Sequence, residues 1–399
     1  MERFEAIRTE ARLIFAPKNR SKTAKTRKPL GPKGLQAHHF REVSPVAAGN
    51  RKSELSWLSL AFCLMVLFSH CSGHPITHLR TDSWQFALVL LLQRLTYVSV
   101  YGFFALSGIK LTLPRSKPVH WPTYWKGRAK SLLIPYLVAN VVYYVFYCWG
   151  IHWYNPSWEK FLGYLLHGNL VSPFYFLIVM FQFTLLAPAI KWIAEHLSPA
   201  LALPVALVIS WGSEVYLADL IGLLIPDYHY RWADRTFTTY LVYYLGGCYI
   251  GRYYDRFTAG VKKFRVPIFL LFAALAGADL YLLWRLRVKG VWSQLVVYSH
   301  LAYLLAAILF CFYAALWLDR PLPKVLARVE QASFLVYLYH SILISALDWL
   351  SMRFAITDVG LLYAIRLPLV FVGTPVLCIV WQEIHKRLSA REQTAKVKA

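Results

Sequence analysis

The sequence predicts an all-α polytopic membrane protein, a bundle of about ten transmembrane helices that follows a disordered basic tail. Apolar residues make up 58% of the 399 residues and charged residues 16%, whereas a soluble domain is about 25% charged. The mean hydropathy is +0.43, and apolar runs long enough to cross a bilayer recur along the chain. Such runs form helices because lipid offers backbone polar groups no other hydrogen-bond partners.

The chain divides into a basic tail (residues 1–54), a transmembrane domain (residues 55–384) and a second basic tail (residues 385–399). The first tail carries thirteen Lys and Arg and five Glu residues with little apolar periodicity, so we expect it to be disordered. The expected membrane spans are 55–72, 92–112, 131–150, 172–192, 198–213, 237–251, 266–284, 295–317, 334–350 and 359–382.

The distribution of basic residues predicts the orientation in the membrane. If both termini are cytoplasmic, 32 of the 43 Lys and Arg residues fall in the inner segments, as the positive-inside rule requires. The net charge of +23 therefore reflects topology and contact with membrane lipid, and we expect no nucleic-acid partner. The expected location is a bacterial inner (plasma) membrane.

No motif for a metal or a resident cofactor occurs in the sequence. The six cysteines are scattered without paired spacing, which is typical of small packing residues. A P-loop, a glycine-rich nucleotide fingerprint and a His/Cys cluster at ligand spacing are all missing. We expect neither a metal nor a bound cofactor.

The most informative residue is His70, which interrupts the first span near its end. A titratable group in a membrane helix is costly and is usually functional, and imidazole suits proton transfer near neutral pH. On a helical wheel His70 shares one face with Ser56, Ser59 and Cys63, so we expect this face to point into the bundle or a wet cavity. The alternative is a packing His that bonds a carbonyl or lies at the outer interface.

A cluster of cations lies at the inner ends of the second and third spans. Lys110 ends the second span, and the loop that follows carries Lys126, Arg128 and Lys130 among aromatic residues. This cluster could grip the phosphates of a nucleotide-type acyl donor. Ordinary positive-inside flanking is the alternative. Ser107, beside Gly108, is typical of close helix packing in lipid.

The outer loop between residues 214 and 235 is a candidate acceptor site. It interleaves aromatic residues with acids, a composition that suits stacking on sugar rings and hydrogen bonding to their hydroxyls. The residues that we expect to contact an acceptor are Asp227, His229 and Trp232. An interfacial aromatic belt beside an acidic loop is the alternative interpretation.

Four motifs, in order between residues 55 and 385, together with the late His of the first span, resemble those of the membrane-bound acyltransferase 3 family. They are Phe103-Phe104-x-x-Ser107-Gly108, Tyr124-x-Lys126-x-Arg128 leading into Leu132-Leu133-x-Pro135-Tyr136, Pro173-Phe174-Tyr175-Phe176-Leu177, and Ser333-Phe334-Leu335-Val336-Tyr337-Leu338-Tyr339-His340. Many family members have an Arg eleven residues before the His, where this sequence has Ser59.

The resemblance implies an O-acyltransferase that moves an acyl group, usually acetyl from acetyl-CoA, to a hydroxyl of a glycan or lipid-linked saccharide. Acetyl-CoA would be a co-substrate, and O-acetylation of a polysaccharide, as in exopolysaccharide biosynthesis, would be the process served. His70 would be catalytic, whereas Ser107, Tyr175 and His340 would position the substrate. Ser59 in place of Arg raises the prospect of an unusual acyl donor.

Two other functions fit the same composition. A transporter or flippase of a lipid-linked saccharide also needs many helices and a few buried polar residues, although no two-half repeat is visible. A non-catalytic component of a polysaccharide-synthesis complex could use the basic tail as a docking arm. Transport without acyl-CoA would favour the first, and Ser59 in place of the family's Arg is the best support for the second.

Overall fold

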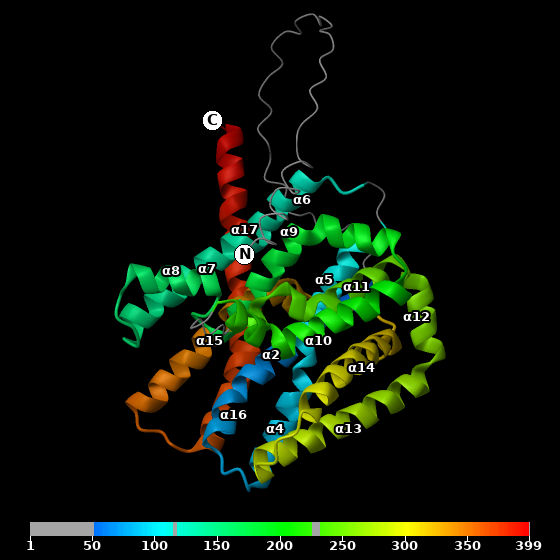
Figure 1. Cartoon of the computed structure of the whole chain (residues 1–399). Coiled ribbons are helices and arrows are strands. Elements are labelled where there is room, and N and C mark those ends of the chain that lie inside the picture. The colour runs from blue at the N-terminus through cyan, green and yellow to red at the C-terminus, as the bar shows by residue number, and fades with distance from the viewer. Residues whose placement is uncertain (1–51, 115–117, 226–231, 399) are drawn as a thin grey trace, which may run out of the picture. The chain divides into compact units, whose positions relative to one another are not determined.

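Every regular element in the part of the chain that the structure describes is a helix (Figure 1). The computed structural model describes residues 52–114, 118–225 and 232–398. This confirms the predicted all-α class. The predicted disorder of the tail 1–54 stays a prediction for residues 1–51, which lie outside the described residues, whereas Ser53 and Glu54 already belong to α2. The last helix continues through the expected C-terminal tail to Lys398.

The helices of the first half run from the first span to the end of the fifth. They are α2 (Ser53–Cys71), α3 (Gly73–His78), α4 (Trp84–Thr96), α5 (Val98–Thr112), α6 (Trp121–Arg128), η1 (Ala129–Leu133), α7 (Ile134–Val145), η2 (Phe146–Gly150), α8 (Trp158–His167), η3 (Ser172–Phe174), α9 (Tyr175–His196) and α10 (Pro199–Leu224).

The second half contains the remaining spans and the shorter helices between them. Its elements are η4 (Ala233–Arg235), η5 (Phe237–Tyr240), α11 (Leu241–Arg252), α12 (Tyr254–Lys263), α13 (Arg265–Lys289), α14 (Leu295–Leu318), α15 (Lys324–Arg353), α16 (Val359–Pro368), η6 (Leu369–Gly373) and α17 (Thr374–Lys398).

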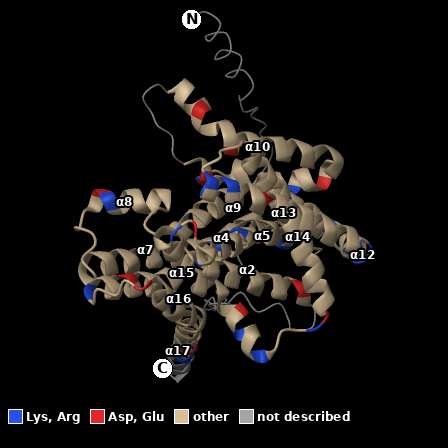
Figure 2. Cartoon of the chain, turned by 90° about the horizontal axis from the view of Figure 1, so that it is seen from below, with Lys and Arg blue, Asp and Glu red and all other residues tan. Residues whose placement is uncertain are grey.

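Nine helical runs among the described residues are long and apolar enough to cross a membrane. They correspond to nine of the ten expected spans. The tenth, 237–251, is η5 followed by α11, which has only 12 residues. Charged residues are sparse along the helices (Figure 2), as the low charge content requires.

The first helix, α2, packs against α15, α5, α14 and α4. The face that the sequence assigned to the interior is buried, since Ser56, Ser59 and Cys63 are each less than 10% exposed. On the opposite side of the helical wheel, Leu64 and Phe68 are partly exposed. The helical-wheel prediction for α2 is therefore confirmed.

Small residues bring α5 and α11 into close contact. A Cβ on Gly108 would overlap the carbonyl oxygen of Tyr244, and a Cβ on Gly247 would overlap that of Ala105. The hydroxyl of Thr112 donates to the carbonyl of Cys248 over 2.6 Å. Gly108 therefore serves helix packing in lipid, where small residues let backbones approach.

Gly108→Ala should destabilise the bundle, because the added methyl meets a backbone carbonyl that cannot move away. We expect a loss of about 1–3 kcal/mol in the free energy of unfolding, measured by thermal unfolding of detergent-purified protein. Gly277→Ala on α13 is the control, because its Cβ would meet open space. Equal unfolding midpoints for the two variants would contradict the proposed contact.

Candidate active site at the end of the first membrane helix

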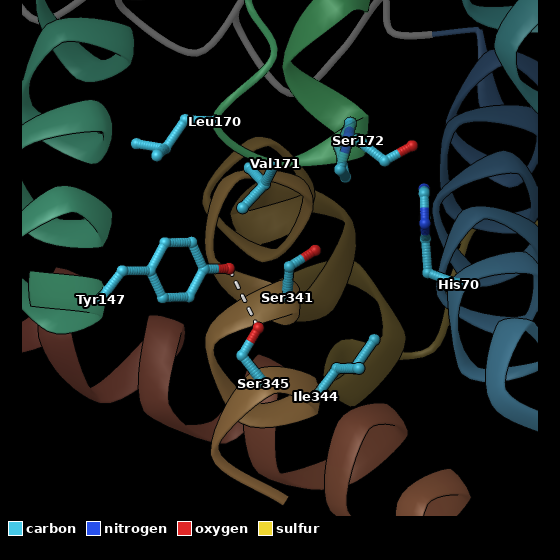
Figure 3. Close-up of a pocket in the computed structure, with 9 residues that line it drawn as sticks. His70, Tyr147, Leu170, Val171, Ser172, Ser341, Ile344 and Ser345 are labelled. Carbon is cyan, nitrogen blue, oxygen red and sulfur yellow. Dashed lines mark hydrogen bonds between the residues drawn. The ribbon is translucent and has the colours of Figure 1, made fainter. Parts of the chain in front are cut away.

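A pocket of about 190 Å³ lies at the last turn of α2 (Figure 3). It is bounded by α2, η2, the segment before α9 and the middle of α15. Its walls combine imidazole, phenol and hydroxyl groups with aliphatic side chains. The lining residues are His70, Tyr147, Leu170, Val171, Ser172, Pro173, Ser341, Ile344 and Ser345.

His70 enters this pocket from the last turn of α2. Among the described residues neither of its ring nitrogens has a hydrogen-bond partner, and the side chain stays partly exposed. Its ring centroid lies 5.1 Å from that of His340, with 46° between the ring planes. An imidazole that faces a cavity with its nitrogens uncommitted is available to exchange a proton with a bound molecule.

His340 is fully buried on α15, where its backbone neighbours determine its tautomer. Its Nδ1 lies 2.9 Å from the carbonyl oxygen of Tyr337 and 3.3 Å from that of Val336. Because a carbonyl only accepts, Nδ1 must carry the proton in the neutral ring. This leaves Nε2 as an acceptor, 3.4 Å from the hydroxyl oxygen of Ser341.

Hydroxyl groups form the wall opposite His70. Tyr147 and Ser345 are hydrogen-bonded to each other over 3.0 Å. The hydroxyl of Ser172 is turned toward the His70 side of the pocket (Figure 3). The Tyr337 hydroxyl donates to the carbonyl of Pro173, which ties the segment before α9 to α15. The pocket therefore offers several groups that could orient an incoming hydroxyl beside an imidazole.

The predicted donor-binding cations lie at the opposite end of α2 from this pocket. The Gln93 side chain donates to the carbonyl of Ser69 over 3.0 Å, and the rings of Phe62 and Phe103 are 5.7 Å apart. The run α4–α5 is thus antiparallel to α2, and Lys110 lies level with the start of α2. At 1.5 Å per residue the two ends are on the order of 25 Å apart.

The basic loop at that end is anchored by its aromatic residues. The Trp125 indole donates to the carbonyl of Thr184 over 2.9 Å, and the Arg128 guanidinium lies 5.4 Å from the centre of the Tyr124 ring. Lys110, Lys126 and Lys130 are exposed, while Arg128 is half-buried. The structure thus places the four predicted donor-binding residues at one end of the bundle and His70 at the other.

Two of the predicted positioning residues are outside the pocket. Ser107 donates to the carbonyl of Phe103 over 2.9 Å within its own helix, and Tyr175 packs against the core on the far side of Pro173. Of the predicted positioning residues, His340 contacts His70. The sequence reasoning missed Tyr147, Ser172, Ser341 and Ser345, although the two α15 serines lie one and five residues after His340.

Of the predicted acceptor residues, Asp227 and His229 lie outside the described residues. Trp232 stacks on His167 with 4.7 Å between ring centroids, and the Arg235 guanidinium lies 4.5 Å from the Trp232 ring centre. Trp232 therefore joins its loop to α8 and does not line the His70 pocket.

Buried ionic groups elsewhere have partners that the sequence left unassigned. Asp279 is 1% exposed and binds Arg94 through two hydrogen bonds of 2.8 and 2.9 Å. Ser299 and His300 also contact its carboxylate, at 3.1 and 3.2 Å. This network joins α4, α13 and α14.

A second ion pair joins Asp348 on α15 to the buried Arg366 on α16. Both pairs follow the rule that charges inside a membrane protein are paired. Among the described residues no group of three or more His, Cys, Asp or Glu side chains could hold a metal ion.

A family model described as an acyltransferase domain, that of the membrane-bound acyltransferase 3 family, matches residues 54–381. No curated protein and no solved structure matches the chain. The matched region begins in the first turn of α2 and ends within α17, so it includes the His70 pocket and the basic loop.

Asp279→Ala should strongly destabilise the protein, because it leaves the Arg94 charge unpaired between membrane helices. We expect a loss of about 3–5 kcal/mol in the free energy of unfolding, measured by thermal unfolding in detergent. Asp82→Ala removes an exposed partner of Arg80 and should leave the unfolding midpoint unchanged. A similar midpoint shift in both variants would contradict a special role for the buried pair.

Proposed function

The chain belongs to the membrane-bound acyltransferase 3 family, and from that premise we propose that it moves an acyl group, in the first instance acetyl, from acyl-CoA to a hydroxyl of a glycan or lipid-linked saccharide. Acetyl-CoA serves as co-substrate, and no resident cofactor takes part. The product is an O-acetylated polysaccharide or its precursor, as in exopolysaccharide biosynthesis.

The observation that carries this proposal is the contact of His70 with His340 at the edge of a hydroxyl-lined pocket. His70 is the late His of the first span and His340 ends the last family motif, 270 positions later in the chain. Acyl transfer to a hydroxyl needs a base within reach of that hydroxyl, and His70 has ring nitrogens that face the pocket. His340, with its tautomer fixed by the Tyr337 carbonyl, supports the orientation of that ring.

In the proposed reaction the acyl-CoA phosphates bind at the end of the bundle that carries Lys110, Lys126, Arg128 and Lys130. The long pantetheine arm extends between the helices toward the pocket. Charge-assisted hydrogen bonds to phosphate are among the stronger polar contacts in proteins. They suit a donor that binds through its phosphates while its thioester extends to the His70 pocket.

At the pocket the acceptor hydroxyl gives its proton to His70 while its oxygen attacks the thioester carbonyl. The carbon–sulfur bond then breaks, the coenzyme A thiolate leaves, and the proton on His70 returns to the sulfur. In an alternative route the acyl group passes first to a nitrogen of His70 and then to the acceptor. Both routes consume one acyl-CoA and one hydroxyl and yield one ester and one thiol.

By the positive-inside rule the cationic end lies in the cytoplasm, together with both termini, and the pocket lies toward the outer face of a bacterial inner membrane. The acyl group would then enter from the cytoplasmic acyl-CoA pool, and the ester would form near the opposite face. A glycan-synthesis complex is the expected partner on that side.

His70→Ala should lower turnover about 10²–10⁴-fold, the usual contribution of general-base assistance, with the thermal unfolding midpoint unchanged. The assay follows radiolabel from acetyl-CoA into the glycan fraction of membranes. His196→Ala, which removes an exposed His at the end of α9, is the control and should retain activity. Near-normal transfer by the His70 variant would remove this residue from the mechanism.

Arg128→Ala should raise the KM for acetyl-CoA about tenfold or more with little change in kcat, because a contact to phosphate is lost. Steady-state kinetics at varied acetyl-CoA concentration measure both constants. Arg256→Ala on α12 removes one exposed positive charge from the same end of the bundle and should leave KM unchanged. If the two variants behave alike, the basic loop would be a topology signal alone.

A further inference from the structure

The segment that leads into α9 lines the pocket, and the first residue of α9, Tyr175, packs against a core that contains further tyrosines. Tyr101 on α5 lies 4.7 Å from Tyr243 and 5.5 Å from Tyr240, measured between ring centroids. Tyr175 packs against the same core and lies two residues after Pro173, which lines the pocket with Ser172. The cluster therefore lies at the same end of the bundle as His70, and Tyr175 follows Ser172 in the pocket wall by three residues of chain.

An acidic residue, Glu214 on α10, faces this cluster. The Ser210 hydroxyl donates to the carbonyl of Thr238 and accepts from the amide of Val242, each over 3.0 Å, which fastens α10 to the start of α11. Glu214 follows one helical turn later and so shares the face of Ser210. Its carboxylate lies within electrostatic range of Tyr101, Tyr240 and Tyr243.

One hydroxyl of the cluster has no hydrogen-bond partner among the described residues. Tyr243 is 3% exposed, and its hydroxyl oxygen is buried with no hydrogen-bond partner among the described residues. Tyr240, by contrast, donates to the carbonyl of Asp234 over 3.0 Å. A buried unpaired hydroxyl costs about 1–3 kcal/mol, and a Phe would pack equally well. The hydroxyl of Tyr243 is therefore explained by a partner that is bound during function.

The chemistry of the cluster selects among ligand classes. Glu214 is exposed, and a solvated carboxylate disfavours an acyl chain, because hydrocarbon laid against it would remove the water around its charge. The same carboxylate repels a phosphate. The nearby cation that could bind a phosphate, Arg94, already pairs with Asp279. Tyrosine offers a flat apolar face and a polar rim at low conformational cost. Tyr101 and Tyr175 are partly exposed, so their faces can stack on a sugar ring while the oxygens of the cluster hydrogen-bond its hydroxyls.

We propose that Tyr101, Tyr175, Tyr240, Tyr243 and Glu214 form a saccharide-binding subsite that holds the acceptor beside the His70 pocket. This proposal rests on the proposed acyl transfer to a glycan and adds the place at which the glycan binds. Glu214 accepts hydrogen bonds from ring hydroxyls, and the Tyr243 hydroxyl gains its missing partner.

The test measures saccharide binding without acyl-CoA, so that it does not depend on transferase activity. Fluorescently labelled protein in nanodiscs is applied to an array of immobilised neutral and acidic oligosaccharides. Wild-type protein should bind at least one class, and Tyr243→Phe and Glu214→Gln should each lower the retained signal roughly tenfold. Thermal unfolding should show Tyr243→Phe to be at least as stable as wild type, since it removes an unpaired oxygen.

Tyr249→Phe is the matched control, because its hydroxyl bonds the carbonyl of Leu197 over 3.2 Å at the other end of α11. It should bind saccharide as wild type does. Equal binding by wild type and both cluster variants would overturn the subsite, as would a folded wild-type protein that binds no saccharide on the array.

The two proposals fail in different ways. If radiolabel moves from acetyl-CoA to glycan while the cluster variants bind saccharide normally, the transferase stands and the subsite lies elsewhere. If the variants lose saccharide binding but no acyl donor supports transfer, the subsite stands and the protein handles saccharides without acylating them.

Discussion

The length of α2 is the constraint on which the proposed reaction depends. The helix begins beside α12, where Glu54 accepts a hydrogen bond from Tyr254, and ends at the pocket with His70. Cations gather at the first end and hydroxyl groups at the second, on the order of 25 Å apart. In the proposed reaction, a donor held by its phosphates and an acceptor held by its sugar meet only if the thioester extends through the bundle. A bundle of membrane helices provides this path, which is why the proposed reaction suits a membrane-embedded transferase.

The packing around α2 keeps this geometry rigid. Gly108 allows α11 to lie against α5, which holds the cationic end together. The Asp279 network ties α4 to α13 and α14. At the pocket, α15 brings His340 against His70 and holds its ring by the Tyr337 carbonyl. A membrane interior makes unpaired charge costly, so these polar contacts hold specific helices together.

Periodicity made the fold and one side of the site predictable. Apolar runs predicted the spans, and the spacing of Ser56, Ser59, Cys63 and His70 predicted which face of α2 turns inward. The tenth expected span, 237–251, is η5 followed by the 12-residue α11, whose glycines pack against α5. The contact of His70 with His340, and the partners of Asp279, depend on helix–helix packing between distant segments. No local pattern encodes such contacts, so Tyr147, Ser172, Ser341 and Ser345 were missed.

The sidedness of acyl transfer tests the account most directly. Membrane vesicles of both orientations would receive radiolabelled acetyl-CoA on the outside, and label in glycan would be measured for wild-type protein. The account predicts transfer in inverted vesicles, whose exposed face carries Arg128 and the basic loop, with the ester formed toward the lumen. Transfer that occurs only in right-side-out vesicles would contradict the passage of the acyl group from the cationic end to the His70 pocket.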